Sequence, residues 1–395
     1  MDTYIYDCVR TPRAKGKPDG TLSGLEPQDL VSQLVTALDQ RNDGACQRAE
    51  QMPLGCVGQV EAQGGNIATL ARLHAGLPDG ISAYSLNNHC ISGLTAIGNA
   101  SNAVAAGQAE VALAGGVEQM SRVPFLADRA AFYKNRSLPK ASRFHIPALA
   151  ADLLATREQI SRTELDRVSA RSHERAHRAE TEDTRLNRSR IPVYYNGGSA
   201  YLDRDERVRS DVTMEGLAEL DPAFPKLDEF NAALVADREH EARHSVSNAP
   251  GMVDGAAMGV IGAGGLAGMP PPRARIVAIA ESTGAPADGL TGGFASMHRI
   301  LKRTGMTLSD FDRIEFMEAF AVVPALFLRD YDVDPDKVNV AGGHLAKGHP
   351  LGASGAILAS SLLDVLDAAD GNLGLVVATG ASGLGAAMIL ERQSS

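Results

Sequence analysis

Two segments, one in each half of the chain, share the order of a glycine-containing loop, a helix of small residues and an apolar strand. In the N-terminal half, the loop Cys90-Ile91-Ser92-Gly93 precedes an Ala-rich stretch with helical character and then the strand-like run Glu110–Ala114. In the C-terminal half, Gly352-Ala353-Ser354-Gly355 precedes an Ala/Leu-rich stretch and then Leu375–Ala378. Strands that alternate with helices are typical of layered α/β folds. The repeat predicts two related α/β halves; chance similarity between Ala/Gly-rich segments is the alternative.

The composition changes along the 395 residues, a length that predicts more than one packed unit. Residues 1–118 are rich in Ala, Gly and Val, and we expect them to form the N-terminal half. Residues 119–243 are charged and irregular, with a helical pattern over Glu164–Ala176, and we expect an inserted loop domain there. The Ala/Gly/Val-rich composition then returns, so we expect 244–270 to rejoin the N-terminal half and 271–395 to form the C-terminal half.

Charge and cysteine content limit the classes of function. The formal net charge of −10 argues against nucleic acid or an anionic membrane as the main partner. The N-terminal residues lack the apolar stretch of a signal peptide, and we expect no membrane span. The four cysteines are too few for a disulfide scaffold and have no metal-ligand spacing, so we expect no metal site and a cytoplasmic location.

Cys90 is the first candidate for chemistry. An apolar strand leads to Asn88-His89-Cys90, and the small-residue helix Leu94–Ala106 follows. A thiol at such a turn faces the N-terminus of a helix, where the backbone dipole stabilises a thiolate. On the residues alone, a buried inert cysteine is the competing interpretation.

His349 is the second candidate. It lies in the loop Asn339–Gly355, which holds a proline, several glycines and a second histidine, His344. Glycines of this density suit close approach of the backbone to a ligand. An imidazole in such a loop could deprotonate a thiol and then stabilise an oxyanion. A purely structural histidine is the competing interpretation.

These segments, taken together, resemble those of the thiolase family, and the resemblance covers essentially the whole chain. The segment 348–355 reads GHPLGASG, which is a full copy of a thiolase signature. The other segments that resemble family motifs are Val9-Arg10-Thr11-Pro12, Gly58–Ala71, Gly115–Ser121 and Asn248–Ala257. The resemblance implies a duplicated α/β fold of five layers, αβαβα, with an inserted loop domain, and a homodimer or homotetramer.

The resemblance also implies a role for each matching position. Cys90 would accept the acyl group, His349 would activate it, and the backbone N–H groups of Cys90 and Ala381 would form the oxyanion hole. The substrate would be a coenzyme A thioester, with no permanently bound cofactor. The positions expected to contact coenzyme A are Arg209, Leu217, Phe224, Val246 and Ser247. A solvated charge is the alternative for Arg209.

Two departures from the family pattern concern the second half-reaction. The NEAF motif of thiolases reads Met317-Glu318-Ala319-Phe320 here, and methionine cannot hold the water that the asparagine would hold. The second family cysteine aligns with Thr379, whose hydroxyl is far too weak an acid to replace a thiol. His344 and His89 are candidate replacements for the missing group.

Smaller departures concern the substrate. Pro250 replaces a serine near the coenzyme, Ile146-Pro147 replaces Met-Gly beside the acyl pocket, and Pro225–Arg243 is an extra stretch. The acyl preference of other thiolases should therefore not be transferred.

The sequence thus predicts an acyltransferase of lipid metabolism that moves an acyl group from acyl-CoA through Cys90 to an acceptor, with an altered second half-reaction. One alternative is conventional thiolase chemistry with His344 or His89 as base. The other is a non-catalytic acyl-CoA-binding subunit.

Overall fold

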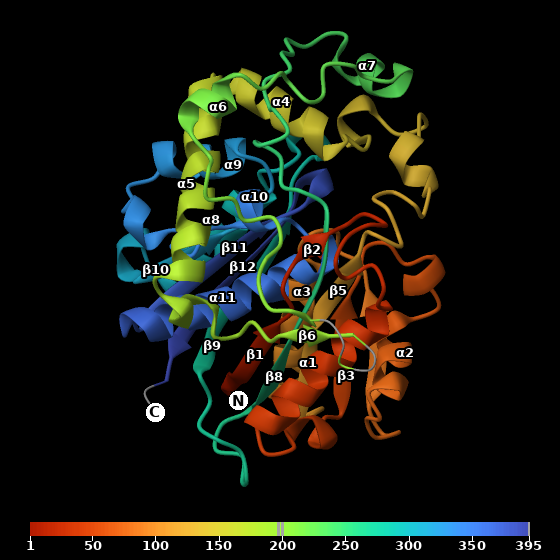
Figure 1. The fold of residues 1–395 in the computed structure, drawn as a ribbon, viewed down its shortest axis with the longest axis vertical. Coiled ribbons are helices and arrows are strands. Elements are labelled where there is room, and N and C mark those ends of the chain that lie inside the picture. Colours follow the sequence, from red (N-terminus) through yellow and green to blue (C-terminus); the bar gives the residue numbers. More distant parts are fainter. Residues whose placement is uncertain (196–197, 199–200, 394–395) are drawn as a thin grey trace.

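The computed structural model describes residues 1–195, 198 and 201–393, and its main sheet has two parts whose strand orders correspond except for the additional edge strand β4 and the short β2 of the N-terminal part. Figure 1 shows the two parts and the helices around them. In the N-terminal half the order is β4-β3-β5-β8-β1, and in the C-terminal half it is β10-β11-β12-β9. The N-terminal strands are β1 (Thr3–Arg10), β2 (Ala14–Lys15), β3 (Gln51–Gly55), β4 (Ser82–Leu86), β5 (Val111–Gln119) and β8 (Val253–Ala263). The C-terminal strands are β9 (Ala274–Thr283), β10 (Arg313–Phe316), β11 (Leu373–Thr379) and β12 (Leu384–Arg392).

The pairing directions in the two halves are the same. β3 runs parallel to β5, and β5 runs antiparallel to β8, which in turn is antiparallel to β1. In the C-terminal half, β10 is parallel to β11, β11 is antiparallel to β12, and β12 is antiparallel to β9. The two parts meet where Tyr4 pairs with Arg275 and Ile5 pairs with Ala274. The fold is therefore duplicated around a short antiparallel contact between β1 and β9.

Helices separate and cover the two parts of the sheet. The central helices α3 (Ser92–Ala105) and α11 (Ser354–Ala369) pack against each other and against strands of both halves. The outer helices are α1 (Pro27–Arg41) and α2 (Ile67–His74) on the N-terminal half and α8 (Gly292–Thr304) on the C-terminal half. The order is helix, sheet, helix, sheet, helix, which is the five-layered thiolase architecture.

The central layer explains why α3 and α11 are rich in small and apolar residues. Every residue of α11 from Ser354 to Ser360 is buried. The two helices approach so closely that a Cβ on Gly93 would lie 2.8 Å from the backbone nitrogen of Ala356, and one on Gly355 would lie 2.4 Å from that of Leu94. Only glycine fits at this crossing. Within the described residues, Leu351–Ala369 is the one stretch long and apolar enough to cross a membrane, and 78% of its apolar window is buried.

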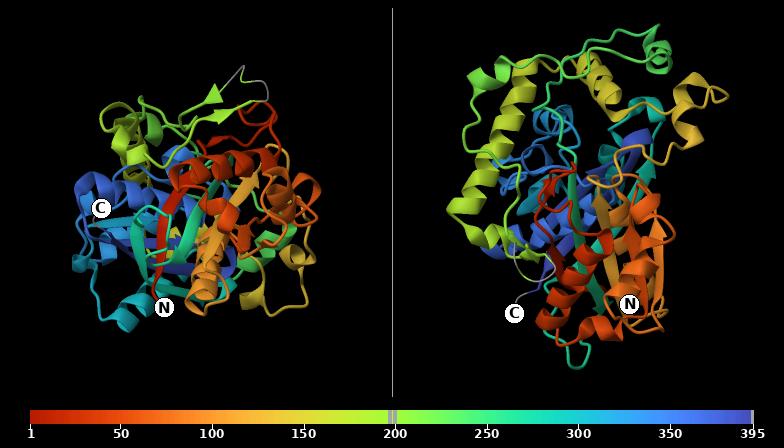
Figure 2. Two further views of the ribbon diagram at one scale, coloured as in Figure 1. Left: turned by 90° about the horizontal axis from the view of Figure 1, so that it is seen from below. Right: turned by 45° about the vertical axis from the view of Figure 1, so that its right-hand side comes forward.

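The segment between β5 and β8 arches over the top of the molecule (Figure 2). The 20-residue helix α5 of this segment begins at a capping box formed by Ser161 and Glu164. The helix buries only one face, which agrees with its charged sequence pattern. The helices and short strands of the segment are α4 (Pro147–Arg157), α5 (Arg162–Thr181), β6 (Val193–Tyr194), β7 (Tyr201–Leu202), α6 (Met214–Ala218) and α7 (Glu229–Val235). Two further helices, α9 (Val322–Asp330) and α10 (His344–Lys347), lie in the C-terminal half.

Candidate active site

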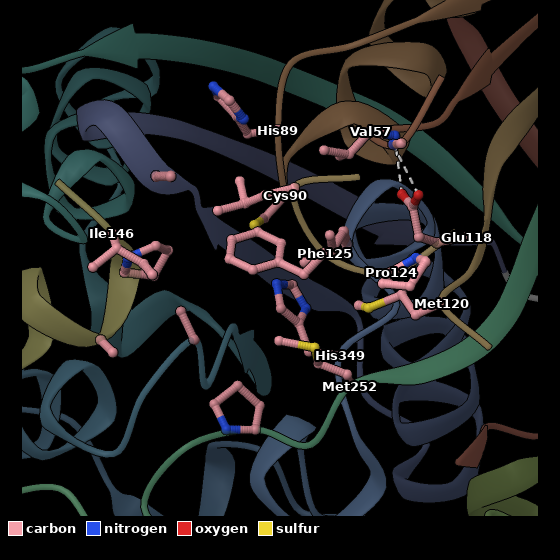
Figure 3. A pocket seen from close by; sticks show the side chains of 18 of the residues that line it. Val57, His89, Cys90, Glu118, Met120, Pro124, Phe125, Ile146, Met252 and His349 are labelled. Carbon is pink, nitrogen blue, oxygen red and sulfur yellow. Dashed lines mark hydrogen bonds between the residues drawn. The ribbon is translucent and has the colours of Figure 1, made fainter. Parts of the chain in front are cut away.

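Duplication places the two candidate loops side by side. Cys90 lies between β4 and α3, and His349 lies in the loop that precedes α11. Because α3 and α11 cross near their first turns, both loops end at the same place. Cys90 and His349 line one cavity of about 1170 Å³, a volume that includes its open mouth (Figure 3).

The turn at Cys90 is held by its neighbours. The backbone N–H of Asn88 donates to Ser92 Oγ at 2.8 Å, and that hydroxyl donates to the carbonyl of His89 at 2.6 Å. His89 itself has a φ of 47°, a left-handed conformation that non-glycine residues rarely adopt. This strained turn presents the thiol to the cavity, and such strain is common at functional sites.

The resting Cys90 is a neutral thiol. Burial raises its pKa to about 12, although the backbone N–H groups of Ala381 and Cys90 act in the opposite direction. The sequence suggested that the helix dipole would stabilise a thiolate, and in the structure desolvation outweighs that effect. The same two N–H groups act on the sulfur itself, so they lie beside the nucleophile.

His349 is oriented by one hydrogen bond. Its Nδ1 lies 2.7 Å from Ser354 Oγ, and its Nε2 has no hydrogen-bond partner among the described residues. Burial lowers its pKa to about 3, so the imidazole is neutral at physiological pH. A neutral ring with one nitrogen fixed and the other free can accept a proton from Cys90.

Glu118, which we did not predict as a site residue, ties the two halves together beside His349. Its carboxylate accepts hydrogen bonds from the backbone N–H groups of Val57 (2.9 Å), Gly58 (3.0 Å) and Gly352 (3.0 Å). Figure 3 shows the bonds to the Val57 loop. Burial raises the pKa of Glu118, and these donors lower it. A lone acid in the otherwise apolar strand β5 was the sequence signal for this role.

The two positions that depart from the family lie outside the cavity. The Thr379 hydroxyl donates to the carbonyl of Leu290 at 2.7 Å, and its residue is 1% exposed. Met317 is fully buried in the main core. Neither side chain is among the residues that line the cavity.

The two candidate replacement bases have different positions. His344 is 1% exposed, does not line the cavity, and packs edge-on against His349 with ring centroids 5.1 Å apart. His89 does line the cavity, but its ring points away from the Cys90 thiol in Figure 3. Burial lowers the pKa of both imidazoles.

Of the five positions expected to contact coenzyme A, Phe224 lines the cavity, where its ring packs edge-on against Phe320. Leu217 is buried in α6, and Val246 is 66% exposed. Ser247 Oγ lies 2.7 Å from Ser245 Oγ, and Arg209 Nε donates to Asp211 at 3.4 Å on the surface. These four are not among the residues that line the cavity.

The substitutions noted beside the substrate all reach the cavity. Ile146, Pro147 and Pro250 are among its lining residues. Much of the remaining wall comes from residues 123–133, which no sequence pattern singled out. In the part of the chain that the structure describes, no cluster of three His, Cys, Asp or Glu side chains could hold a metal ion.

Comparison with known proteins agrees with this geometry. The family description "Thiolase, N-terminal domain" matches residues 3–234, and "Thiolase, C-terminal domain" matches residues 270–392. A β-ketoadipyl-CoA thiolase of Pseudomonas aeruginosa is 34% identical, with 99% of each chain covered. A 3-ketoacyl-CoA thiolase of Vibrio cholerae is 35% identical, with 98% of each chain covered. The chain therefore belongs to the thiolase family and is an acyltransferase of lipid metabolism that acts on coenzyme A thioesters without a permanently bound cofactor.

Proposed function

We propose that this enzyme transfers the acyl group of an acyl-CoA to Cys90 and then to an acceptor that does not require the second cysteine of thiolases. The proposal rests on which of the four side chains in question line the cavity. Cys90 and His349 share the cavity, while the side chains at positions 317 and 379 lie outside it.

The first half-reaction uses groups that are present. His349 takes the proton from Cys90 as Sγ attacks the thioester carbonyl, and the N–H groups of Cys90 and Ala381 stabilise the oxyanion. The bond between the carbonyl carbon and the coenzyme sulfur then breaks, and His349 returns the proton to the leaving thiolate. The products are free coenzyme A and an acyl-Cys90 thioester.

The second half-reaction needs an acceptor that the remaining groups can activate. His349 is neutral again after coenzyme A leaves, so it can take a proton from an oxygen, nitrogen or sulfur nucleophile. A carbon nucleophile formed by decarboxylation, such as a malonyl unit, needs no base at all. Removal of a proton from a second acyl-CoA would require a further base, and the loss of one costs about 10²–10⁴-fold in rate.

Intact-protein mass spectrometry with a panel of acyl-CoAs tests the first half. We expect an adduct of acyl mass on the wild type and on Cys46→Ala, which lacks a buried thiol in the α1 region, and none on Cys90→Ala. Absence of any adduct on the wild type, with coenzyme A still bound, would favour the non-catalytic binding subunit.

Thiolysis tests the second half. If the proposal is right, acetoacetyl-CoA plus coenzyme A yields acetyl-CoA at least about 100-fold more slowly than the enzyme forms its acyl adduct, because the acetyl-CoA carbanion released by carbon–carbon cleavage lacks the acid that the second cysteine of thiolases supplies. Thiolysis as fast as adduct formation would support conventional thiolase chemistry. In that case His89→Gln should abolish it, because of the two candidate histidines only His89 lines the cavity.

We also propose a homodimer or homotetramer in the cytoplasm. The outer edge of β4 has no partner strand within the described residues, and Leu70 and Leu73 of the adjacent α2 are 41% and 58% exposed. An open edge beside exposed apolar side chains favours association. All four cysteines are free, which suits a reducing compartment. Light scattering of the eluted protein would measure the assembly, and a monomeric mass would contradict it.

A further inference from the structure

One wall of the cavity is apolar and aromatic. Phe125, Leu126, Tyr133 and Phe144 line it, and the rings of Tyr133 and Phe144 pack against each other with centroids 4.9 Å apart. Phe144 is 4% exposed, and Phe132 packs edge-on against it at 5.7 Å. Aromatic rings packed in this way form a stiff surface that binds apolar groups.

Two carboxylates, and no lysine or arginine, line the cavity among the residues that the structure describes. Glu118 is engaged by three backbone N–H groups and by the Gln63 side-chain amide. Asp128 is half-buried and accepts one hydrogen bond, from the Tyr133 hydroxyl at 2.8 Å. Asp128 also acts electrostatically on His89, the residue before the nucleophile, so its charge is felt close to Cys90.

A carboxylate at the end of an acyl group would be unfavourable beside this wall of the cavity, which we call the acyl chamber. It would lose hydration against apolar side chains, find no cation to pair with, and lie near Asp128, a charge of the same sign. The neighbouring Arg129 is exposed and does not line the cavity. An uncharged apolar acyl group meets none of these costs.

We infer that the acyl chamber takes uncharged apolar acyl groups and excludes those that end in a carboxylate, with Asp128 as a specificity-determining residue. The inference rests on the proposed function, because it assumes that the group bound in this chamber is the one carried to Cys90. It goes further by naming the class of acyl group and the side chain that selects it.

Titration calorimetry of the Cys90→Ala variant tests the inference without any turnover. Hexanoyl-CoA and glutaryl-CoA share the coenzyme and differ at the far end of the acyl group. We expect hexanoyl-CoA to bind roughly tenfold or more tightly, the size of a like-charge interaction at about 8–10 Å in a partly solvated site. Equal affinities, or tighter binding of glutaryl-CoA, would overturn the inference.

Two further substitutions in the Cys90→Ala background assign the effect to Asp128. Asp128→Asn keeps a hydrogen-bond acceptor for the Tyr133 hydroxyl. It should reduce the ratio of the affinity for hexanoyl-CoA to the affinity for glutaryl-CoA by roughly tenfold. The matched control is Asp79→Asn, because the Asp79 side chain is 100% exposed and the substitution changes net charge equally. A ratio unchanged in Asp128→Asn, or narrowed equally in Asp79→Asn, would contradict the role of Asp128.

A gain-of-charge variant keeps the test decisive if Asp128→Asn does not fold. Leu126→Arg places a cation on the same wall at a half-buried position and should shift preference toward glutaryl-CoA. No shift would count against the chamber as the acyl site. These binding ratios are independent of the mass-spectrometric adduct, so failure of acyl transfer and failure of this specificity are distinguishable.

Discussion

Ser354 is the residue that decides how the His349 imidazole is oriented. Its hydroxyl is the described partner of Nδ1, at 2.7 Å, and it is fully buried in the first turn of α11. A fixed Nδ1 leaves Nε2 with a defined role, either proton acceptor or donor. If His349 is the base we propose, its proton transfer depends on the orientation that Ser354 gives it.

Replacement of that hydroxyl should slow chemistry while leaving binding largely unchanged. In Ser354→Ala we expect the rate of acyl-Cys90 formation to fall by roughly 10–100-fold, because the imidazole loses its orienting bond. Single-turnover mass spectrometry gives the rate, and calorimetry with coenzyme A gives the affinity. Recovery of most of the rate in Ser354→Thr would support orientation, whereas equal loss in both variants would indicate a packing effect.

For Thr379 we expect the opposite result, because its hydroxyl stabilises the fold and does not take part in the chemistry that we propose. Thr379→Val keeps the shape of the side chain and removes the hydrogen bond to the buried Leu290 carbonyl. We expect the free energy of unfolding to fall by about 1 kcal/mol and the rate of acyl transfer to change less than about threefold. Urea denaturation and the adduct assay check the two parts. A hundredfold loss of rate would mean that the hydroxyl takes part in the chemistry.

At the residue scale the two candidate side chains could be singled out from the sequence because each lies in a distinctive motif. The structure places Cys90 and His349 on one cavity. The sequence could not indicate that Thr379 and His344 do not line it, because side-chain direction depends on tertiary packing. Glu118 was overlooked as a site residue for a related reason, since its three backbone partners come from segments far apart in sequence.

Among the elements, the extra stretch Pro225–Arg243 is the one that most changes the surroundings of the cavity. It contains α7, whose Phe230 and Leu234 pack against Leu149 and Leu153 of α4. Its acidic side chains pair with basic residues of the segment that carries the aromatic wall. These pairs are Lys134 with Asp228, Arg136 with Glu229 and Lys140 with Asp237. The stretch Pro225–Arg243 therefore packs against the outer side of the segment that carries the aromatic wall.

The apolar contacts should matter more to this attachment than the ion pairs. Leu234 is fully buried, so Leu234→Ala should weaken the docking of α7 by about 2 kcal/mol. Exposed ion pairs contribute about 0–1 kcal/mol, so Glu229→Ala should have little effect. Hydrogen exchange read by mass spectrometry should show faster exchange over 131–144 and 225–240 in Leu234→Ala alone. Similar acceleration in both variants would mean that the charges hold the wall.

Helices and strands with a clear hydrophobic pattern could be predicted from the sequence, whereas the aromatic wall of the cavity could not. The pattern over Glu164–Ala176 predicted a helix, and α5 extends it to Arg162–Thr181 because a capping box precedes it. The run Leu375–Ala378 is the centre of β11. Residues 120–146 contain mainly turns and short helical segments, with Leu126 and Arg129 at positive φ. No periodic sequence pattern therefore predicted their structure.

At the scale of the whole molecule, duplication explains why the site exists where it does. Each half supplies one loop that precedes a central helix, and the crossing of α3 and α11 brings the loops together. The repeat was visible in the sequence, but the position of β8 was harder to foresee. It follows the inserted segment in the sequence, yet it lies between β1 and β5 in the sheet.

The buried imidazole of His344 in α10 makes the stability of the whole molecule sensitive to acid. His344 is 1% exposed, neither of its ring nitrogens has a hydrogen-bond partner within the described residues, and burial holds its pKa well below 6.5. The folded state therefore keeps this imidazole neutral, while the unfolded chain protonates it near pH 6.5. Its contribution to stability is complete above pH 6.5 and is lost as the pH falls below that value.

His344→Leu should remove that loss, because leucine has a similar volume and cannot be protonated. The free energy of unfolding of the variant, relative to the wild type, should rise by about 2 kcal/mol between pH 7.5 and pH 5. Urea denaturation at the two pH values measures this difference, and a third pair of curves at pH 8.5 should repeat the result at pH 7.5. Parallel behaviour of the two proteins down to pH 5 would mean that His344 becomes protonated within the fold, which would require solvent or a partner to reach a ring that the packing of α10 now encloses.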